Sequence, residues 1–233
     1  MNESAQPELG VLHFLSQIDA MGMVVLLLLL LLSLASWYLI LLKATAVIGE
    51  RKRAEAFLKE FWEADSLASI GAKLTAPDNA FAALAAAAQA ASERQQQGLH
   101  KLADAGGFAE YLTRVLRNGI DQESARVEHG LTLLASAGSA APFIGLFGTV
   151  WGIYHALLTI GATGQGTLDK VAGPVGEALI MTALGLAVAI PAVLAYNAFT
   201  RRNRLWLAEL DGFAHDLYAL MTVGPKSDRS GER

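Results

Sequence analysis

The most informative shortage in this sequence is one of charge. Charged residues make up 17% of the 233 residues, against about 25% in soluble domains, whereas 53% are hydrophobic. There is no cysteine, which excludes a disulfide framework and any thiol or thiolate–metal chemistry. The net charge of −4, without a basic run interleaved with aromatic residues, argues against a nucleic-acid partner. The composition therefore favours a membrane protein.

The sequence also lacks the residue sets that most enzymes need. Its five histidines are scattered, and no two of them have metal-ligand spacing. No nucleophile and base occur in a recognisable pattern, and there is no phosphate-binding loop. We therefore expect no enzyme activity, no metal site and no cofactor.

Three long apolar segments dominate what is present, at residues 21–42, 131–160 and 174–200. Each can cross a hydrocarbon core about 30 Å thick, which takes about 20 helical residues. No alternating strand pattern occurs anywhere in the chain. The predicted fold class is all-α, a polytopic membrane protein with three transmembrane helices and long helices that extend into the cytoplasm.

The first apolar segment has an alternative interpretation as a cleaved signal peptide. It contains the leucine run Leu26–Leu32, followed by the small residues of Ser33–Ser36. A signal peptide has a basic region before a shorter apolar core, however, and residues 1–20 are acidic. A retained membrane helix is therefore favoured.

The flanking charges predict how the chain crosses the membrane. Residues 1–20 contain no Lys or Arg, whereas Lys43 and Arg51–Arg53 follow the first segment and Arg201–Arg204 follow the third. Because Lys and Arg collect on the cytoplasmic side, we expect the N-terminus outside and the C-terminus inside. The predicted layout is an external N-terminus 1–20, span 21–42, cytoplasmic region 43–130, span 131–160, external loop 161–173, span 174–200, and a cytoplasmic C-terminal helix and tail 201–233.

The cytoplasmic region has the pattern of a helical bundle. Ala54, Leu58 and Phe61 recur at helical spacing. Pro77–Asn79 is expected to end one helix and cap an alanine-rich helix over residues 80–94. Positive and negative side chains are evenly mixed in this region, which is typical of a solvated bundle surface, although a partner-binding surface is the alternative.

Two further helices are predicted on the cytoplasmic side. One covers residues 108–129 and is expected to run on without a break into the second span. The other covers residues 204–221 and has a coiled-coil-like seam, which would pack on a helix of the same bundle or of a neighbouring subunit. The seam consists of Trp206, Leu210, Phe213, Leu217 and Leu220.

Small residues recur along the second and third spans. Gly138, Gly145 and Gly152 are spaced by seven, which keeps them on one side of a helix. The third span continues the theme, for example at Ala178 and Gly185. Small residues let helices approach closely in lipid. The stripes are typical of packing faces, and pore walls are the alternative.

A few polar residues interrupt this apolar hairpin. Thr149 lies 12 residues before Gly161 and Thr182 lies 9 after Gly173, which places both hydroxyls roughly 14–18 Å from the loop. Glu177, the only acidic or basic residue of the third span, lies roughly 6 Å from the loop end by the same rise, and His155 has a comparable height.

Each of these polar residues has a purely structural interpretation. The threonines could bond their own carbonyls at i−4, His155 could lie at the membrane interface, and Glu177 could reach out to the surface. Acids within a membrane usually face an interior or a water-filled cavity and mark ion or proton paths. We therefore take Glu177, Thr149 and Thr182 as the candidate pathway residues.

Three segments carry a resemblance to a known family. They are APFIGLFGTVWGI at 141–153, AGPVGEAL at 172–179 and AIPAVLAYN at 189–197. With these motifs and the three-span layout, the chain resembles the MotA/TolQ/ExbB proton-channel family over essentially its whole length. The resemblance is strongest over residues 131–221, whereas the loop 43–130 matches in layout more than in residues.

The resemblance implies a homopentamer around a central pore, surrounded by lipid in the inner membrane of a Gram-negative bacterium, with the N-terminus periplasmic. Members of the TonB system hold single-span ExbD helices in this pore. They use the proton motive force to energise TonB, which drives uptake of iron–siderophores and vitamin B12. The resemblance also implies that Glu177, Thr149 and Thr182 line the proton pathway. The alternatives are a TolQ-like motor of envelope integrity and a passive membrane scaffold.

Overall fold

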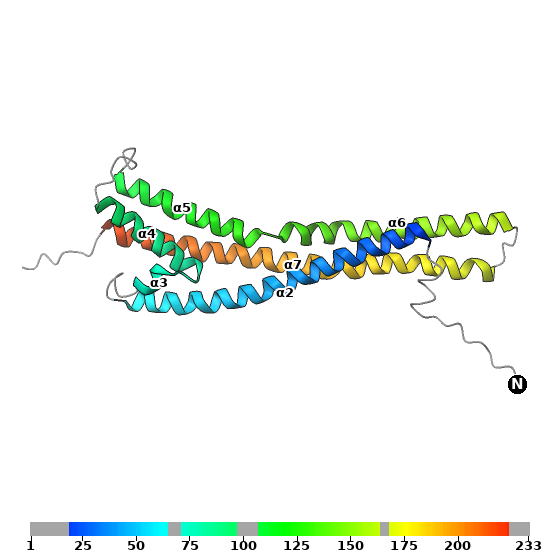
Figure 1. Ribbon diagram of the computed structural model, residues 1–233, viewed down its shortest axis with the longest axis horizontal. Coiled ribbons are helices and arrows are strands. Elements are labelled where there is room, and N and C mark those ends of the chain that lie inside the picture. Colours follow the sequence, from blue (N-terminus) through cyan, green and yellow to red (C-terminus); the bar gives the residue numbers. More distant parts are fainter. Residues whose placement is uncertain (1–18, 65–70, 97–106, 164–167, 224–233) are drawn as a thin grey trace, which may run out of the picture. The chain divides into compact units, whose positions relative to one another are not determined.

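The fold is entirely helical over the described part of the chain. The computed structural model describes residues 19–64, 71–96, 107–163 and 168–223, and no strand occurs within these ranges (Figure 1). Three helical stretches in them are long and apolar enough to cross a membrane. The predicted all-α, three-helix membrane architecture is confirmed. The termini 1–18 and 224–233 lie outside the described residues.

Two of the helices are much longer than a membrane span. The chain divides into two compact units, a hairpin unit of residues up to 41 and 130–198, and a bundle unit of residues 42–129 and from 199 on. Both long helices, α2 and α7, contribute to both units. The helices are α2 (Ala20–Glu63), α3 (Gly71–Thr75), α4 (Ala80–Gln96), α5 (Gly107–Glu128), α6 (Leu131–Thr163) and α7 (Leu168–Val223).

The helix α6 and the first half of α7 form the predicted hairpin and run side by side (Figure 1). Both extend into the expected connection 161–173, because α6 ends at Thr163 and α7 already begins at Leu168. The first half of α2 contacts the hairpin through Val25 and Leu29, which are buried with Ala141 and Met181. The membrane boundaries themselves stay predictions.

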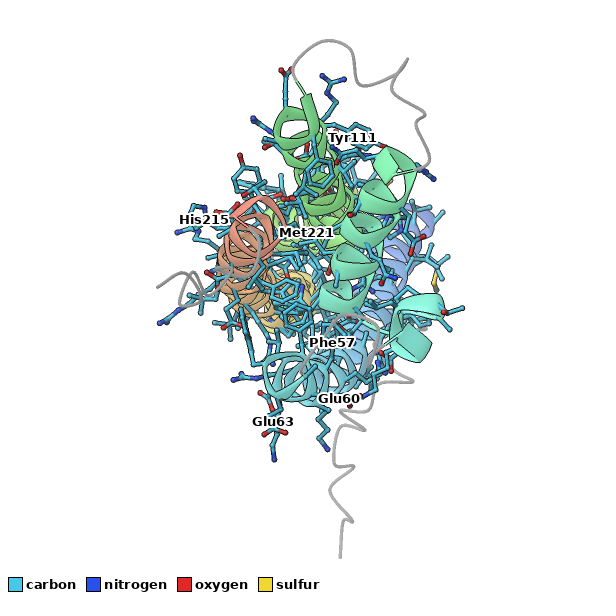
Figure 2. All side chains as sticks on the ribbon, turned by 90° about the vertical axis from the view of Figure 1, so that its left-hand side faces the viewer. Phe57, Glu60, Glu63, Tyr111, His215 and Met221 are labelled. Atoms are coloured by element: carbon cyan, nitrogen blue, oxygen red, sulfur yellow. The ribbon has the colours of Figure 1, made fainter. Side chains whose placement is uncertain are left out.

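The bundle unit has an aromatic core. Phe57 and Phe61 of α2, Phe81 of α4 and Phe213 of α7 are buried in one cluster, and the ring centroids of Phe61 and Phe213 are 5.0 Å apart. Figure 2 looks into this bundle, with Phe57 and Met221 near its centre and Glu63 at its edge. The helical spacing of Ala54, Leu58 and Phe61 is confirmed, since all three contribute to the core.

The predicted cap of the alanine-rich helix is confirmed. The backbone N–H of Ala82 donates to Asn79 Oδ1 over 3.0 Å, and Asn79 immediately precedes α4. Such a side-chain oxygen satisfies one of the free N–H groups in the first helical turn. The short polar run 77–79 therefore fixes where α4 begins.

The prediction of an unbroken helix from residue 108 into the second span is wrong. Helix α5 ends at Glu128 and α6 begins at Leu131, with Gly130 between them at φ 80°. This left-handed backbone conformation favours glycine, because a Cβ atom would be strained there. A single glycine thus interrupts what the apolar periodicity suggested was continuous.

The predicted seam of the C-terminal helix is correct except at its end. Leu210, Phe213 and Leu217 are buried, but Leu220 is 55% exposed. Met221 packs on the core in its place. A straight helix drifts by about 20° per heptad from a strict 3.5-residue repeat, so a seam drawn at that repeat leaves the buried face after two heptads.

Candidate functional site

The hairpin helices touch backbone to backbone at a pair of glycines. A Cβ atom added at Gly145 would lie 2.5 Å from the Met181 carbonyl oxygen, and one at Gly185 would lie 2.6 Å from the Ala141 oxygen. Both distances are shorter than any real contact of a Cβ atom, so only glycine permits this approach. The crossing point of α6 and α7 is therefore set by Gly145 and Gly185.

The seven-residue glycine repeat follows the same interface. A Cβ atom added at Gly138 would lie 2.4 Å from Val193, and one at Gly152 would lie 2.9 Å from the Cβ atom of Ala178. Together with Gly145, the whole repeat faces α7. Within this chain the stripe is a packing face, as the interpretation from helix packing predicted.

Thr149 and Thr182 meet directly across this interface. Their Oγ1 atoms are 2.6 Å apart, and the Thr149 hydroxyl also lies 2.9 Å from the Ala178 carbonyl oxygen and 3.2 Å from that of Gly145. Thr149 is buried and Thr182 is half-buried. The predicted agreement in depth is thus confirmed by contact. The i−4 bond that threonine usually makes is present as well, but the shorter contacts cross to α7.

The two hydroxyls form a short donor and acceptor chain. A hydroxyl carries one proton to donate and two lone pairs to accept with. In one arrangement the Thr149 hydroxyl accepts a hydrogen bond from Thr182 and donates to one of its two neighbouring carbonyl oxygens. In the other it donates to the Thr182 hydroxyl and to neither carbonyl oxygen. Rotation of one hydroxyl switches between these arrangements, so the pair can exchange hydrogen bonds without any movement of the helices.

The local sequence explains why these hydroxyls come so close. Gly145 lies one helical turn before Thr149, and Gly185 lies three residues after Thr182. The missing side chains bring the two backbones together one turn from the hydroxyls, which then span the remaining gap. The glycines and the threonines are therefore parts of one arrangement.

Glu177 lies next to this contact but does not join it. It is half-buried and directly precedes Ala178, whose carbonyl oxygen is a neighbour of the Thr149 hydroxyl. Within the described ranges its carboxylate has no hydrogen-bond or ion-pair partner. Five residues along a helix correspond to a rotation of about 140° after one turn, so Glu177 and Thr182 point in different directions. The structure brings the two hydroxyls together and leaves the carboxylate free to face another partner.

Asp19 is a further polar residue of the hairpin unit, which the sequence analysis did not single out. Its Oδ1 atom accepts from the Gly22 amide over 2.8 Å, and its Oδ2 atom accepts from the Trp151 indole N–H over 2.6 Å. Burial raises the pKa of Asp19, but these hydrogen bonds and the nearby His155 outweigh it and leave the pKa below its ordinary value. An acid directly before an apolar helical run is a cap signal that could have identified it.

The bundle unit contains a buried carboxylate that the sequence analysis also missed. Glu123 accepts two hydrogen bonds from Arg126, over 2.7 and 2.8 Å, and one from the Trp206 indole over 2.9 Å. Arg126 in turn pairs with Glu50 at 3.0 Å. The bonds to Glu123 raise the pKa of Arg126 despite its partial burial, so it remains charged. This network ties α2, α5 and α7 together.

The end of α5 is held by two side chains. Lys43 Nζ and Asn203 Nδ2 both donate to the Val127 carbonyl oxygen, over 2.9 and 2.8 Å. This carbonyl lies in the last turn of α5, where a helix leaves its oxygens without backbone partners. Burial, and then the proximity of Arg126, lower the pKa of Lys43. Lys43 thus has a structural role beyond its charge.

Comparison with known proteins places this geometry in a family. The MotA/TolQ/ExbB proton channel family matches residues 87–211, which include the glycine crossing, both threonines and Glu177. The chain belongs to this family. A protein of Xanthomonas campestris pv. campestris named biopolymer transport protein ExbB is 38% identical over 234 residues, covering 96% of this chain and 92% of the relative.

Two further relatives show the range of the similarity. An ExbB of Neisseria meningitidis is 44% identical over 198 residues, covering 84% of this chain and 89% of the relative. A Tol-Pal system protein TolQ of Pseudomonas aeruginosa is 33% identical over 212 residues, covering 89% and 90%. The chain is thus a multi-pass membrane protein of a proton-channel family whose named members are channel and transport subunits.

Proposed function

We propose that this chain is the proton-channel and stator subunit of a TonB–ExbB–ExbD complex in the inner membrane of a Gram-negative bacterium. It forms a homopentamer, with the N-terminus and residues 161–173 periplasmic and residues 43–130 and 201–233 cytoplasmic. The pore holds ExbD helices, and the complex uses the proton motive force to energise TonB for uptake of iron–siderophores and vitamin B12. This proposal makes the chain a transport subunit and not an enzyme.

The observation that carries the proposal is the hydroxyl pair of Thr149 and Thr182 beside Glu177. Polar groups in an apolar hairpin are costly, and intramembrane acids typically mark ion or proton paths. The two hydroxyls are 2.6 Å apart and can exchange hydrogen bonds by rotation. Glu177 contributes a carboxyl group one helical position from Ala178, whose carbonyl oxygen the Thr149 hydroxyl contacts.

The unpartnered carboxylate supports a second chain in the pore. Within the described residues nothing of this chain pairs with Glu177, and an acid in hydrocarbon needs a partner or water. An ExbD helix that carries the cycling aspartate would supply this partner. A proton that crosses a potential of about 100 mV releases about 2.3 kcal/mol, so several protons per cycle can drive a rotation or a pull.

The decisive variant is Glu177→Gln in a strain whose own subunit is deleted. We expect normal assembly and loss of siderophore-dependent iron uptake, because the amide cannot titrate. The matched control is Glu63→Gln, an exposed acid at the end of α2 in the bundle unit, which should leave uptake unchanged. Wild-type uptake by Glu177→Gln would contradict the proposed pathway.

The proposed ExbD partner and the proposed pentamer can each be tested by a separate measurement. Co-purification with a single-span ExbD-type protein from the same organism tests the predicted partner. The mass of the detergent-solubilised complex tests the pentamer, and any other number of copies of this chain would refute it. Neither measurement depends on the assignment of Glu177.

The similarity to a TolQ protein supports a second candidate function. At 33% identity over most of the chain, its similarity is not far below that of the ExbB relatives. Complementation separates the two functions, because a TonB-system subunit restores iron uptake whereas a Tol-system subunit restores resistance to detergents in a strain lacking TolQ. Restoration of detergent resistance alone would favour the Tol system.

A further inference from the structure

We propose that Asp19 is a positioning residue for the proposed proton pathway, on which this inference rests. Its carboxylate binds the Trp151 indole and thereby holds α6 in the rotation at which Thr149 meets Thr182. Asp19 lies outside the family's matched residues 87–211, and Trp151 lies within them. The inference therefore connects the start of the chain to the polar centre of the hairpin.

The two oxygens of the Asp19 carboxylate accept hydrogen bonds from different groups. Oδ1 caps the first turn of α2 through the Gly22 amide at 2.8 Å, and the Asp19 carbonyl accepts from Met23 at 3.0 Å. Oδ2 accepts from the Trp151 indole at 2.6 Å, across 132 positions of sequence. A cap alone needs one acceptor, which serine or asparagine would supply equally well. The second oxygen makes a charge-assisted bond to another helix, which is a stronger and more directional contact.

Trp151 is held in place from its other sides as well. Its ring stacks on Phe147 with centroids 6.4 Å apart and lies 6.2 Å from the ring of Tyr154. The aromatic neighbours restrict the side chain along α6, and Asp19 fixes the polar end of the indole. The orientation of this side chain is therefore tied to the start of α2.

The position of Trp151 along α6 makes its orientation matter for the pathway. Thr149 lies two residues before it, and Gly152, the next residue, packs on Ala178 of α7. Successive residues of a helix point about 100° apart. Trp151 therefore faces the start of α2, whereas Gly152 faces α7. A rotation of α6 that breaks the Asp19 bond would also move the Thr149 hydroxyl away from α7.

The absence of cysteine allows a direct test of this register. The pair Thr149→Cys and Thr182→Cys should form a disulfide readily when a thiol oxidant is added, because the two oxygens that they replace are 2.6 Å apart. We expect the rate of disulfide formation to fall about tenfold when Asp19→Ser or Trp151→Phe is added, and no further when both are added, as for a coupled pair. This readout does not depend on proton transport.

Two substitutions at position 19 separate positioning from capping. Asp19→Ser keeps an acceptor for the Gly22 amide but is too short to reach the indole, whereas Asp19→Ala loses both contacts. If Asp19 only caps α2, Asp19→Ser should cross-link like the parent and Asp19→Ala should be slower. If Asp19 positions α6, disulfide formation should be equally slow with Asp19→Ser and with Asp19→Ala. Disulfide formation at the parent rate with Asp19→Ser overturns the positioning role.

Transport measurements then distinguish this inference from the proposed function. With Thr149 and Thr182 intact, Asp19→Ser and Trp151→Phe should each lower iron uptake per assembled complex about tenfold, without additivity. Full uptake by both variants, in cells where Glu177→Gln is inactive, would overturn the positioning role alone. Full uptake by Glu177→Gln would overturn the proposed pathway, whatever the cross-linking rates show.

Discussion

The hydroxyl oxygens of Thr149 and Thr182 lie 2.6 Å apart, although 33 positions separate the two residues. The contact joins α6 to α7 in the apolar hairpin, one turn from the closest approach of their backbones at Gly145 and Gly185. Packing and polar chemistry are therefore linked at this point, and a substitution that changes one should change the other.

The first prediction concerns the glycine crossing. Gly145→Ala should destabilise the purified protein by about 1–3 kcal/mol, because the new methyl group would lie 2.5 Å from the Met181 carbonyl oxygen and force the helices apart. Thermal unfolding in detergent measures this. Gly161→Ala is the control, since nothing lies within 4 Å of its added Cβ atom. Equal melting temperatures of the two variants would show that the hairpin is not packed as described.

The second prediction concerns the hydroxyl at position 149. Thr149→Val keeps the shape of the side chain but removes its hydrogen bonds, so transport should fall strongly while the protein still assembles. Thr149→Ser keeps the hydroxyl and should retain most of the transport, measured as siderophore-dependent iron uptake. Thr113→Val is the matched control, because the Thr113 hydroxyl donates to its i−4 carbonyl oxygen, at 2.8 Å, on an exposed face. Equal activity of Thr149→Val and Thr149→Ser would exclude a role for the hydroxyl.

The third prediction concerns the buried Glu123 in the bundle unit. Arg126→Met removes the two hydrogen bonds that Arg126 donates to Glu123 and leaves this carboxylate with the Trp206 indole alone. The free energy of unfolding should fall by about 1–3 kcal/mol, as expected for a buried polar group that loses most of its partners. Arg114→Met, which breaks an exposed pair with Glu110, should cost less than about 1 kcal/mol. Chemical denaturation of the two variants compares these costs, and a larger cost at Arg114 would contradict this account.

The fourth prediction concerns the pH dependence of stability at Asp19. Its pKa is lowered in the folded protein, so the ionised form is favoured by folding. The resulting stabilisation is complete above the ordinary pKa of about 3.9 and is lost as the pH falls through the lower folded value. The difference in stability between wild type and Asp19→Asn should therefore be constant from neutral pH to about pH 5 and shrink in stronger acid. If the difference in stability between wild type and Asp19→Asn grew as the pH falls, the lowered pKa of Asp19 would be contradicted.

Much of the architecture follows from short-range features of the sequence. Uninterrupted apolar runs predicted three membrane helices, and the spacing of Ala54 and Phe61 predicted the buried face of the first bundle helix. Asn79 acts as the expected cap because its side chain reaches only the next turn. Counting residues from the loop was enough to place Thr149 and Thr182 at matching depths, since the rise of a helix is constant.

The long-range contacts were decided only by the tertiary structure. The partners Asp19 and Trp151 are 132 positions apart, and Glu123 and Trp206 are 83 apart. Such pairs depend on how each helix is rotated about its axis, and an error of one residue turns a side chain by about 100°. The same sensitivity explains why the core takes up Met221 where the sequence indicated Leu220. Composition and periodicity thus determined the helices and the matching levels of the two threonines, whereas the rotation of each helix, and with it the polar contacts of the site, required the packed structure.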